Sequence, residues 1–473
     1  MMWKVRGEVW SFLGKASHAV GANLVSLAVS VVTTLLVPRF LGVEEFGYFQ
    51  LYLFYSSYVG LLHFGWNDGV LLRLGGSRYG ELNRSHVYSQ FLVLVAQQAV
   101  VALLIALVGI LVLGDPQLRF VAIALAICLL LTGPQYMLLF VLQATLRIRE
   151  YAQIVIAQRV FFAAWVVVAL LAGRSSFEEI VVADLVSRLA ATALAVYFCR
   201  EVVVRRLSSF VFVRTEVVET LAAGAPLMLA SVAGSLVIGV VRFGISTQWS
   251  IAVFGQVSLA LSLSNMALTA IVSIGSVAFP MLRRAPEAQF ARIYASGRHI
   301  LTAVAAMFLL LYYPTSHFLL AWLPAYAASV SYLALLFPLF IFQARSSLLV
   351  ETFLKAQRRE RAILFVNVAV LALSVVTTFL LTQVLVNLFA AVLSITVLSA
   401  LRCIALELAV SRVVRPKLVW DLLLELSLVS AFLVSIAVLG ALESFAVTLC
   451  AIVVWLYVTR EKSIGAMRVL VRR

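Results

Sequence analysis

Residues 16–37 read ASHAVGANLVSLAVSVVTTLLV, a run of 22 residues without Asp, Glu, Lys or Arg. A helix rises about 1.5 Å per residue, so this run is long enough to cross the roughly 30 Å hydrocarbon core of a bilayer. Lys4, Arg6 and Lys15 precede it. The run is longer than the apolar core of a secretory signal and lacks a convincing small-residue cleavage site. We therefore interpret it as a retained transmembrane helix.

The whole chain is also rich in hydrophobic residues and poor in charged ones. Of its 473 residues, 63% are hydrophobic and 12% are charged, whereas soluble domains carry about 25% charged residues. The sequence therefore predicts an all-α polytopic bundle in which lipid is the solvent. The net charge of +15 does not indicate nucleic acid binding, because the basic residues form short clusters between apolar runs.

Apolar runs of spanning length recur along the chain and predict about fourteen transmembrane helices. The last two are separated only by Gly440 and the short stretch around Glu443. The expected helices lie near residues 16–38, 46–65, 86–113, 119–142, 154–173, 180–199, 218–240, 249–279, 297–322, 330–354, 362–382, 387–410, 422–440 and 443–459.

Basic residues fix the expected orientation. With the N-terminus inside, every cytoplasmic segment carries a cluster of Lys or Arg, including Arg283, Arg284, Arg292 and Arg298 before the ninth helix. Outer segments hold only Arg39, Arg119, Arg174 and Arg242. By the positive-inside rule, both termini are expected in the cytoplasm, and the protein in the cytoplasmic (inner) membrane.

An internal repeat divides the expected helices into six, six and two. Corresponding segments recur in the same order at offsets of about 203 to 212 residues. The pairs are 37–40 with 240–243, 46–47 with 254–255, 71–73 with 281–283, and 143–150 with 355–360. We therefore predict six-helix lobes at 1–210 and 211–415, followed by two helices and a basic tail at 416–473. Parallel repeats with a cavity between them are typical of transporters.

Two motifs resemble a known family. The first is Pro38-Arg39-Phe40-Leu41-Gly42-Val43-Glu44-Glu45-Phe46-Gly47-Tyr48, and the second is Phe64-Gly65-Trp66-Asn67-Asp68-Gly69-Val70 with Arg73. Both resemble segments of Wzx-type polysaccharide and O-antigen flippases, which belong to the multidrug/oligosaccharidyl-lipid/polysaccharide (MOP) superfamily with the MATE exporters and the lipid II flippase MurJ. The resemblance implies a V-shaped MATE/MurJ-like fold, and transport rather than enzymatic chemistry.

The resemblance also implies a substrate and partners. The substrate would be an oligosaccharide repeat unit on undecaprenyl pyrophosphate, turned from the cytoplasmic to the outer leaflet by alternating access. Membrane lipid and the polymerase and other proteins of the export pathway would be partners, and no cofactor is implied. A proton or sodium ion could drive transport. However, Val241 stands before Arg242 where relatives often carry an acid, which weakens the case for ion coupling there.

Charged residues within the expected helices are the first site candidates, because intramembrane charges usually face a cavity or one another. Arginine suits a pyrophosphate, since its planar fork binds two oxygens and stays charged. The intramembrane candidates are Arg159, Arg188, Arg345 and Arg402, and Arg39 and Arg242 occupy repeat-equivalent outer helix ends. The acids recognised within the helices are Asp184, Glu351 and Glu407.

Each candidate has a structural alternative. Asp184 and Arg188 are four residues apart and could neutralise each other. Arg159 could extend to the cytoplasmic interface, and Arg39 and Arg242 could be interfacial anchors. Arg345 has no acid three or four residues away and is the first cavity candidate, followed by Arg402. Glu407 is expected to be solvated near a helix end.

Polar residues that could contact sugar form a second group. Tyr48, Tyr52, Tyr55 and Tyr58 share one face of the second helix, and an aromatic belt at the interface is the alternative. The sugar candidates are Tyr52, Tyr55, Tyr58, His63 and Asn23 on the first two helices, and Asn265 on the eighth. Helix packing is the alternative for the small polar residues.

Other activities fit the sequence less well. No phosphate loop, catalytic triad or metal-spaced His/Cys set is apparent, and Cys128, Cys199, Cys403 and Cys450 all lie in or beside apolar runs. A MATE-like exporter of drugs or cations is the main alternative, but it needs an acid for cation binding. A membrane polymerase would need a large outer loop, and none is expected.

Overall fold

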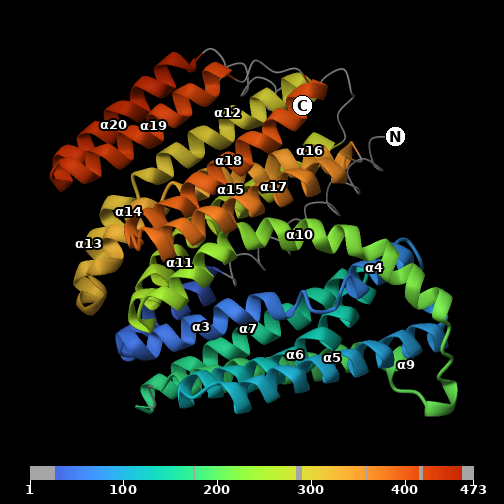
Figure 1. Cartoon of the computed structure of the whole chain (residues 1–473). Coiled ribbons are helices and arrows are strands. Elements are labelled where there is room, and N and C mark those ends of the chain that lie inside the picture. The colour runs from blue at the N-terminus through green and yellow to red at the C-terminus, as the bar shows by residue number, and fades with distance from the viewer. Residues whose placement is uncertain (1–26, 174–175, 284–289, 358, 415–418, 461–473) are drawn as a thin grey trace. The chain divides into compact units, whose positions relative to one another are not determined.

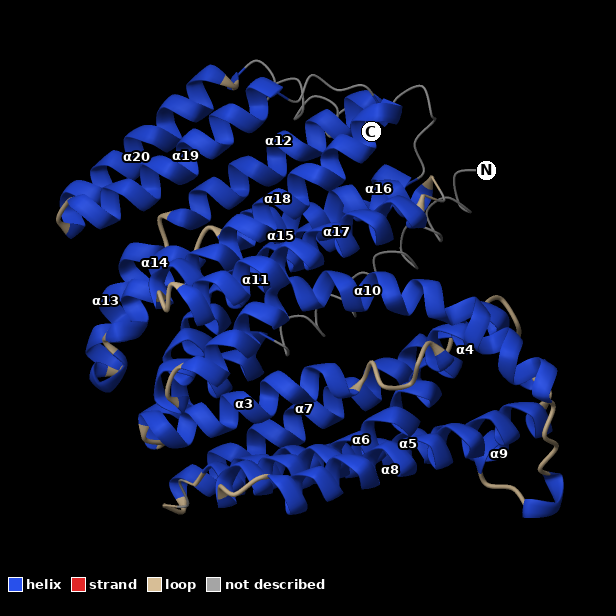
Figure 2. Cartoon of the chain, in the orientation of Figure 1, coloured by secondary structure: helices blue, strands red, loops and turns tan. Residues whose placement is uncertain are grey.

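The computed structural model describes residues 27–173, 176–283, 290–357, 359–414 and 419–460 (Figure 1). Within these ranges every regular element is a helix (Figure 2), which confirms the all-α prediction. The major helices are α2 (Val37–Phe40), α3 (Val43–Val59), α4 (Trp66–Leu74), α5 (Arg84–Val112), α6 (Pro116–Ala144), α7 (Ile148–Leu171), α8 (Phe177–Phe198), α9 (Arg200–Val203), α10 (Arg214–Gln248), α11 (Ile251–Arg283), α12 (Phe290–Leu309), α13 (Tyr312–Trp322), α14 (Ala328–Leu336), α15 (Leu339–Arg345), α16 (Glu351–Ala356), α17 (Glu360–Phe379), α18 (Leu388–Val414), α19 (Val419–Val438) and α20 (Ala441–Val458). Short turns of 3-10 helix lie at Tyr79–Glu81, Leu207–Ser209 and Pro324–Tyr326, and π-helical turns at Val32–Leu36, Ser346–Val350 and Leu380–Val384.

The helices account for the predicted spans. Within the described residues, twelve helices are long and apolar enough to cross a membrane, and they correspond to the third to fourteenth expected helices. The first expected helix is described only from Leu27 to Phe40. The second is interrupted, so neither α3 nor α4 spans by itself. The uncertain final pair is present as α19 and α20, which are separated at Gly440, whose N–H donates to Glu443 Oε2 over 3.4 Å.

The described chain forms two compact units, here called the first lobe (described residues up to 232) and the second lobe (described residues from 233 onward). Helix α10 continues from one lobe into the other. The six-six-two division at residues 210 and 415 stays a prediction from the repeat.

In the first lobe, α6 is the central helix, and its most apolar window is 72% buried. It packs against α3, α4, α5, α7 and α8 (Figure 1). Two apolar clusters surround its C-terminal half. They contain Trp66, Val70, Leu94, Met137 and Val141 in one group, and Leu138, Leu142, Ile154, Ala191 and Ala195 in the other. The lobe is therefore built around one buried helix whose neighbours cover it on several sides.

The second expected helix is broken in its middle. Helix α3 ends at Val59 and α4 begins at Trp66, and Phe64 and Gly65 between them have positive φ angles of 51° and 90°. Irregular backbone at membrane depth requires hydrogen-bond partners from the protein. The carbonyl of Leu62 receives them from Nε2 of Gln97 and Nε2 of Gln98, each at 3.0 Å. The protein therefore provides hydrogen-bond donors for the Leu62 carbonyl at the break.

Glycines after this break let α4 and α10 touch through their backbones. A Cβ added to Gly69 would lie 1.9 Å from the Thr220 carbonyl oxygen. A Cβ added to Gly224 would lie 1.9 Å from the carbonyl oxygen of Gly65. Neither carbonyl is a flexible side-chain end, so a larger residue must separate the two helices.

In the second lobe, α11, α12, α15 and α18 pack together, with α14 against α11 and α18. An apolar cluster fills the space between α12, the π-helical turn Ser346–Val350, α16 and α18. It contains Ile293, Tyr294, Leu349, Val350, Leu354, Leu406 and Val410. The α19–α20 hairpin packs through α20 on α12 and through α19 on α14 (Figure 1). The final helix pair is therefore part of the packed lobe.

Replacing Gly69 by alanine tests the backbone contact between α4 and α10. Overpacking of this kind costs about 1–3 kcal/mol, so the midpoint of thermal unfolding in detergent is expected to fall. Gly80→Ala is the matched control, because a Cβ at Gly80 meets nothing within 4 Å. Equal midpoints for the two variants would contradict the close approach.

Candidate functional site

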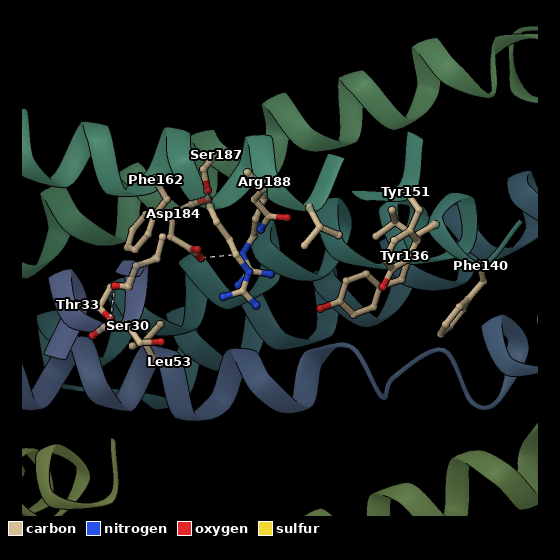
Figure 3. A pocket seen from close by; sticks show the side chains of 15 residues that line it. Ser30, Thr33, Leu53, Tyr136, Phe140, Tyr151, Phe162, Asp184, Ser187 and Arg188 are labelled. Atoms are coloured by element: carbon tan, nitrogen blue, oxygen red, sulfur yellow. Dashed lines mark hydrogen bonds and ion pairs between the residues drawn. The ribbon is translucent and has the colours of Figure 1, made fainter. Parts of the chain in front are cut away.

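A cavity of about 460 Å³ opens within the first lobe, between the helix that ends at Phe40, α3, α6, α7 and α8 (Figure 3). Its wall combines charged, polar and aromatic side chains. They include Ser30, Thr33, Tyr136, Phe140, Tyr151, Gln158, Arg159, Phe162, Asp184, Ser187 and Arg188. A polar hollow of this size within helices that span a membrane is a candidate binding site.

Regular helical spacing puts these residues on one wall. On α7, positions 151, 155, 158, 159 and 162 line the cavity, which is the pattern of a single helix face. On α8 the lining positions are 184, 187 and 188. The cavity is therefore formed by the inward faces of otherwise apolar helices.

Arg188 is held at the cavity wall by two partners. Its Nε donates to Asp184 Oδ2 over 2.7 Å, one helical turn away (Figure 3). Its Nη1 donates to Thr132 Oγ1 over 3.1 Å. The same Asp184 oxygen accepts from the Tyr52 hydroxyl over 2.6 Å. The pairing expected from the four-residue spacing is thus present. It fixes the guanidinium and offsets most of its charge.

Arg159 gives the cavity its excess charge. It lies on α7 with an exposed side chain and lines the same cavity. The neighbouring Gln158 accepts a hydrogen bond at Oε1 from Gln135 Nε2 over 2.8 Å. Among the lining residues, two guanidinium groups therefore face one carboxylate. The cavity is suited to an anionic group rather than to a cation.

The tyrosines predicted to contact sugar do not line this cavity, and their contact with sugar stays a prediction. Tyr52 is fully buried, and Tyr55 and Tyr58 pack on Phe54 with ring centroids 5.0 and 5.4 Å apart. The tyrosines that line the cavity are Tyr136 and Tyr151, which the sequence reasoning missed. The spacing of seven between Tyr151 and Gln158 could have indicated Tyr151, because it places both residues on the face of α7 that carries Arg159.

The other polar candidates occupy separate places. His63 is 6% exposed and lies in the break between α3 and α4, where its Nδ1 accepts from the Gly65 N–H over 3.0 Å. Asn265 is exposed on α11 in the second lobe. Asn23 lies outside the described residues. The structure does not bring His63 or Asn265 to the cavity wall that it describes.

Arg402 forms its own polar cluster in the second lobe. Its Nε donates to Asn367 Oδ1 over 2.8 Å and its Nη2 donates to Glu351 Oε1 over 2.6 Å. The backbone of Gly234 packs against the Arg402 guanidinium, since a Cβ added to Gly234 would lie 2.9 Å from Arg402 Nη2. Arg402 thus resembles Arg188 in being tied to a carboxylate, while 19% of its side chain stays exposed.

Arg345 is almost fully buried and paired in the second lobe, with 1% of its side chain exposed. Its guanidinium contacts Glu407 and Glu425, and the same two glutamates contact Arg298. Two expectations were wrong: Glu407 is 0% exposed rather than solvated, and Arg298 is buried rather than part of a cytoplasmic loop. The role of Arg345 in headgroup binding stays a prediction.

The sequence reasoning missed the acids that begin α19. Asp421 and Glu425 are buried, and they share a helix face with Leu428, Phe432 and Ser435. The spacing of four, three, four and three residues was a readable signal. With these two carboxylates counted, the four intramembrane arginine candidates no longer outnumber the acids.

Arg39 lies at a helix end, as expected, whereas Arg242 lies inside α10, which continues six residues beyond it to Gln248. Arg39 is exposed in the last turn of α2. Arg242 donates from Nη2 to Ser258 Oγ over 3.0 Å, and its guanidinium carbon lies 5.3 Å from the centroid of the Phe254 ring. Headgroup contact and interfacial anchoring are both compatible with these positions. Within the described part of the chain, no cluster of three or more His, Cys, Asp or Glu could hold a metal ion.

Removing Asp184 tests the Arg188 pairing. The Asp184→Ala variant leaves a guanidinium without its carboxylate, and breaking a buried pair costs about 3–5 kcal/mol, less where a cavity admits water. The free energy of unfolding should fall by the lower part of that range. The double variant Asp184→Leu with Arg188→Met should recover much of the loss. Equal losses in the single and double variants would argue against charge pairing as the cause.

Comparisons with known proteins agree on the fold. No family model and no curated protein matches the chain. The inward closed lipid II flippase MurJ is similar with a TM-score of 0.57 at 11% identity, over 93% of this chain and 98% of that one. An inward-facing MATE family multidrug resistance transporter gives 0.61 at 11% identity, over 82% and 92%. A MOP superfamily transporter from Pyrococcus furiosus gives 0.56 at 11%, over 84% and 95%. The chain therefore has the fold of the MOP superfamily transporters.

Proposed function

We propose that this protein is a flippase that carries an oligosaccharide linked through pyrophosphate to a polyprenyl lipid, from the cytoplasmic to the outer leaflet of the inner membrane. The observation that carries the proposal is the first-lobe cavity, where Arg159 and the anchored Arg188 outnumber the single carboxylate of Asp184. The fold shared with MurJ and the MATE transporters supports a transport function.

The physical problem of such a substrate matches this cavity. A pyrophosphate cannot enter hydrocarbon without a large desolvation cost, so it needs fixed cations and a polar lining along its route. Arginine forks bind phosphate oxygens in pairs and stay charged at any physiological pH. In our proposal, Arg159 binds the headgroup first and Arg188 adds a second, positioned guanidinium.

The remaining lining suits a sugar. Tyr136 and Tyr151 provide aromatic faces and hydroxyl groups, and Ser30, Thr33 and Gln158 provide small polar groups around the same hollow (Figure 3). Aromatic side chains present an apolar body and a polar tip, which matches the two kinds of surface on a sugar ring. The lipid tail would stay among the exposed apolar side chains of the helices.

A cation exporter of the MATE type is the second candidate, because several solved structures with this fold are MATE transporters. Asp184 is the carboxylate in the cavity that a cation would need. However, the 2.7 Å contact with Arg188 Nε offsets its charge, and Arg159 adds repulsion. Cation export would require both effects to be reversed.

Flipping in reconstituted vesicles tests the proposal. The probe is a fluorescent polyprenyl-pyrophosphate disaccharide, and the readout is its loss of access to a membrane-impermeant quencher. Arg159→Ala should lower the rate at least tenfold, because one lost charged hydrogen bond is worth about 1.5–3 kcal/mol. Arg149→Ala is the matched control, since Arg149 is exposed on the same helix and does not line the cavity.

A lysine at position 159 separates charge from geometry. Arg159→Lys should restore part of the rate, because a point charge replaces the planar fork. A wild-type protein that moves a cationic dye but not the pyrophosphate probe would overturn the proposal in favour of the MATE-type function. Equal rates for Arg159→Ala and Arg149→Ala would remove Arg159 from the mechanism.

A further inference from the structure

The segment of the first lobe that connects α9 to α10 combines arginines with exposed apolar side chains (Figure 1). We call residues 204–214 the α9–α10 linker; they read VRRLSSFVFVR, with three arginines and no acid. Leu207 is 76% exposed and Phe212 is 57% exposed. The other exposed apolar residues of the linker are Val204, Phe210 and Val211. Adjacent exposed apolar side chains bordered by charge are typical of a surface that binds a protein or a membrane.

Two hydrogen bonds hold the linker beside α5. The Tyr88 hydroxyl donates to the Arg205 carbonyl over 3.1 Å, and the Val211 N–H donates to Ser89 Oγ over 2.8 Å. Both partners on α5 lie in its second turn, because the helix begins at Arg84. The linker therefore lies along the side of α5 and does not extend beyond its end.

The length of α5 sets the depth of the linker in a bilayer. The helix has 29 residues and is about 43 Å long, whereas the hydrocarbon core is about 30 Å thick. With the helix centred in the bilayer, about 6 Å of each end lies among the headgroups. Tyr88 and Ser89 are four and five residues from the start of α5, which is about 6–8 Å along its axis. The linker is therefore placed at the boundary between the headgroups and the hydrocarbon.

The helices that flank the linker indicate the same level. Helix α8 ends at Phe198 and α10 begins at Arg214, and both helices are long and apolar enough to span. Just before the linker, Tyr197 is 60% exposed, and the Arg200 guanidinium carbon lies 5.5 Å from the centroid of its ring. Exposed tyrosines and arginines are common where a helix leaves the hydrocarbon core.

The charge of the linker is not neutralised by the acids that flank it. Each of these acids has a partner outside the linker: Glu201 contacts Arg84 (2.7 Å), Glu216 contacts His86 (2.5 Å) and Glu219 contacts Arg73 (3.1 Å). Arg206 and Arg214 are exposed, and they form no ion pair among the described side chains. Two guanidinium groups thus remain available beside apolar side chains, which matches a phosphate group attached to acyl chains.

We propose that the α9–α10 linker is a binding surface for anionic phospholipid. Leu207, Phe210 and Phe212 insert among the acyl chains. Arg206 and Arg214 bind the headgroup phosphates, and they favour lipids of net negative charge because a zwitterionic headgroup adds a cation that they repel. The position at the hydrocarbon boundary favours lipid over a soluble protein, which would first have to displace lipid from the apolar side chains.

Lipid binding would hold the start of α10 at the interface, because Arg214 is the first residue of that helix. The inference does not depend on the identity of the transported substrate, so it can fail while the proposed function stands.

A fluorescent label at position 207 tests insertion. The full chain carries Cys450→Ser, which removes the exposed native thiol, and Leu207→Cys is labelled with bimane in phosphatidylcholine nanodiscs. Acrylamide, a neutral water-soluble quencher, should act severalfold less on this label than on one at Gly80→Cys. Gly80 is the matched control, because it is exposed between the charged Arg78 and Glu81. Equal quenching at the two positions would overturn insertion and leave the surface to a soluble partner.

Lipid selectivity at the same label tests the arginines. Nitroxide-bearing phosphatidylglycerol should be enriched there over nitroxide-bearing phosphatidylcholine by at least about fivefold, the effect of one charge near the surface. The double variant Arg206→Gln with Arg214→Gln should remove the enrichment. Arg78→Gln with Arg149→Gln should keep it, because both arginines are exposed outside the linker. Equal quenching by the two lipids with both linker arginines present, or enrichment that survives their replacement, would overturn the proposal.

Discussion

Hydrocarbon offers no partner for a charge or for a backbone polar group, and this constraint accounts for most of the specific contacts in the structure. It explains why the break between α3 and α4 is closed by Gln97 and Gln98, which donate to the carbonyl of Leu62. It also explains why the deep arginines are tied to carboxylates. Where polar chemistry is needed inside a membrane, the chain must provide both partners.

The two lobes meet this constraint in different ways. In the first lobe, Arg188 is anchored by Asp184 while Arg159 remains on the wall of a hollow, so the cavity keeps a positive excess. In the second lobe, Arg298 and Arg345 are enclosed with Glu407 and Glu425. The first arrangement leaves charge available to a ligand, whereas the second uses it to join helices. This difference is why the proposed headgroup site is in the first lobe.

Much of the fold could be predicted from the sequence, because apolar runs of spanning length are unambiguous. The pairing of Asp184 with Arg188 was also predictable, since both residues are on one helix. The contacts of Arg345 were not, because Glu407 is 62 residues away and Glu425 is 80 residues away along the chain. Examining neighbours within a single helix made Arg345 seem unpaired. The break at Phe64 and Gly65 was missed for a similar reason, since the apolar run continues through it.

The final helix pair is joined to the second lobe by buried acidic residues of α19. Asp421 and Glu425 lie on the buried face of α19, and Glu425 contacts both Arg298 and Arg345. Without α19, Arg298 and Arg345 would keep only Glu407 of the two glutamates that they share. The pair is therefore expected to matter for the integrity of the lobe as well as for any contact with lipid.

The most direct test of the central claim is an experimental structure of the full chain with a polyprenyl-pyrophosphate disaccharide bound. Our account predicts density for the pyrophosphate beside the guanidinium groups of Arg159 and Arg188, with the sugar near Tyr136 and Tyr151. Headgroup density away from the first-lobe cavity, for example beside Arg345, would contradict it.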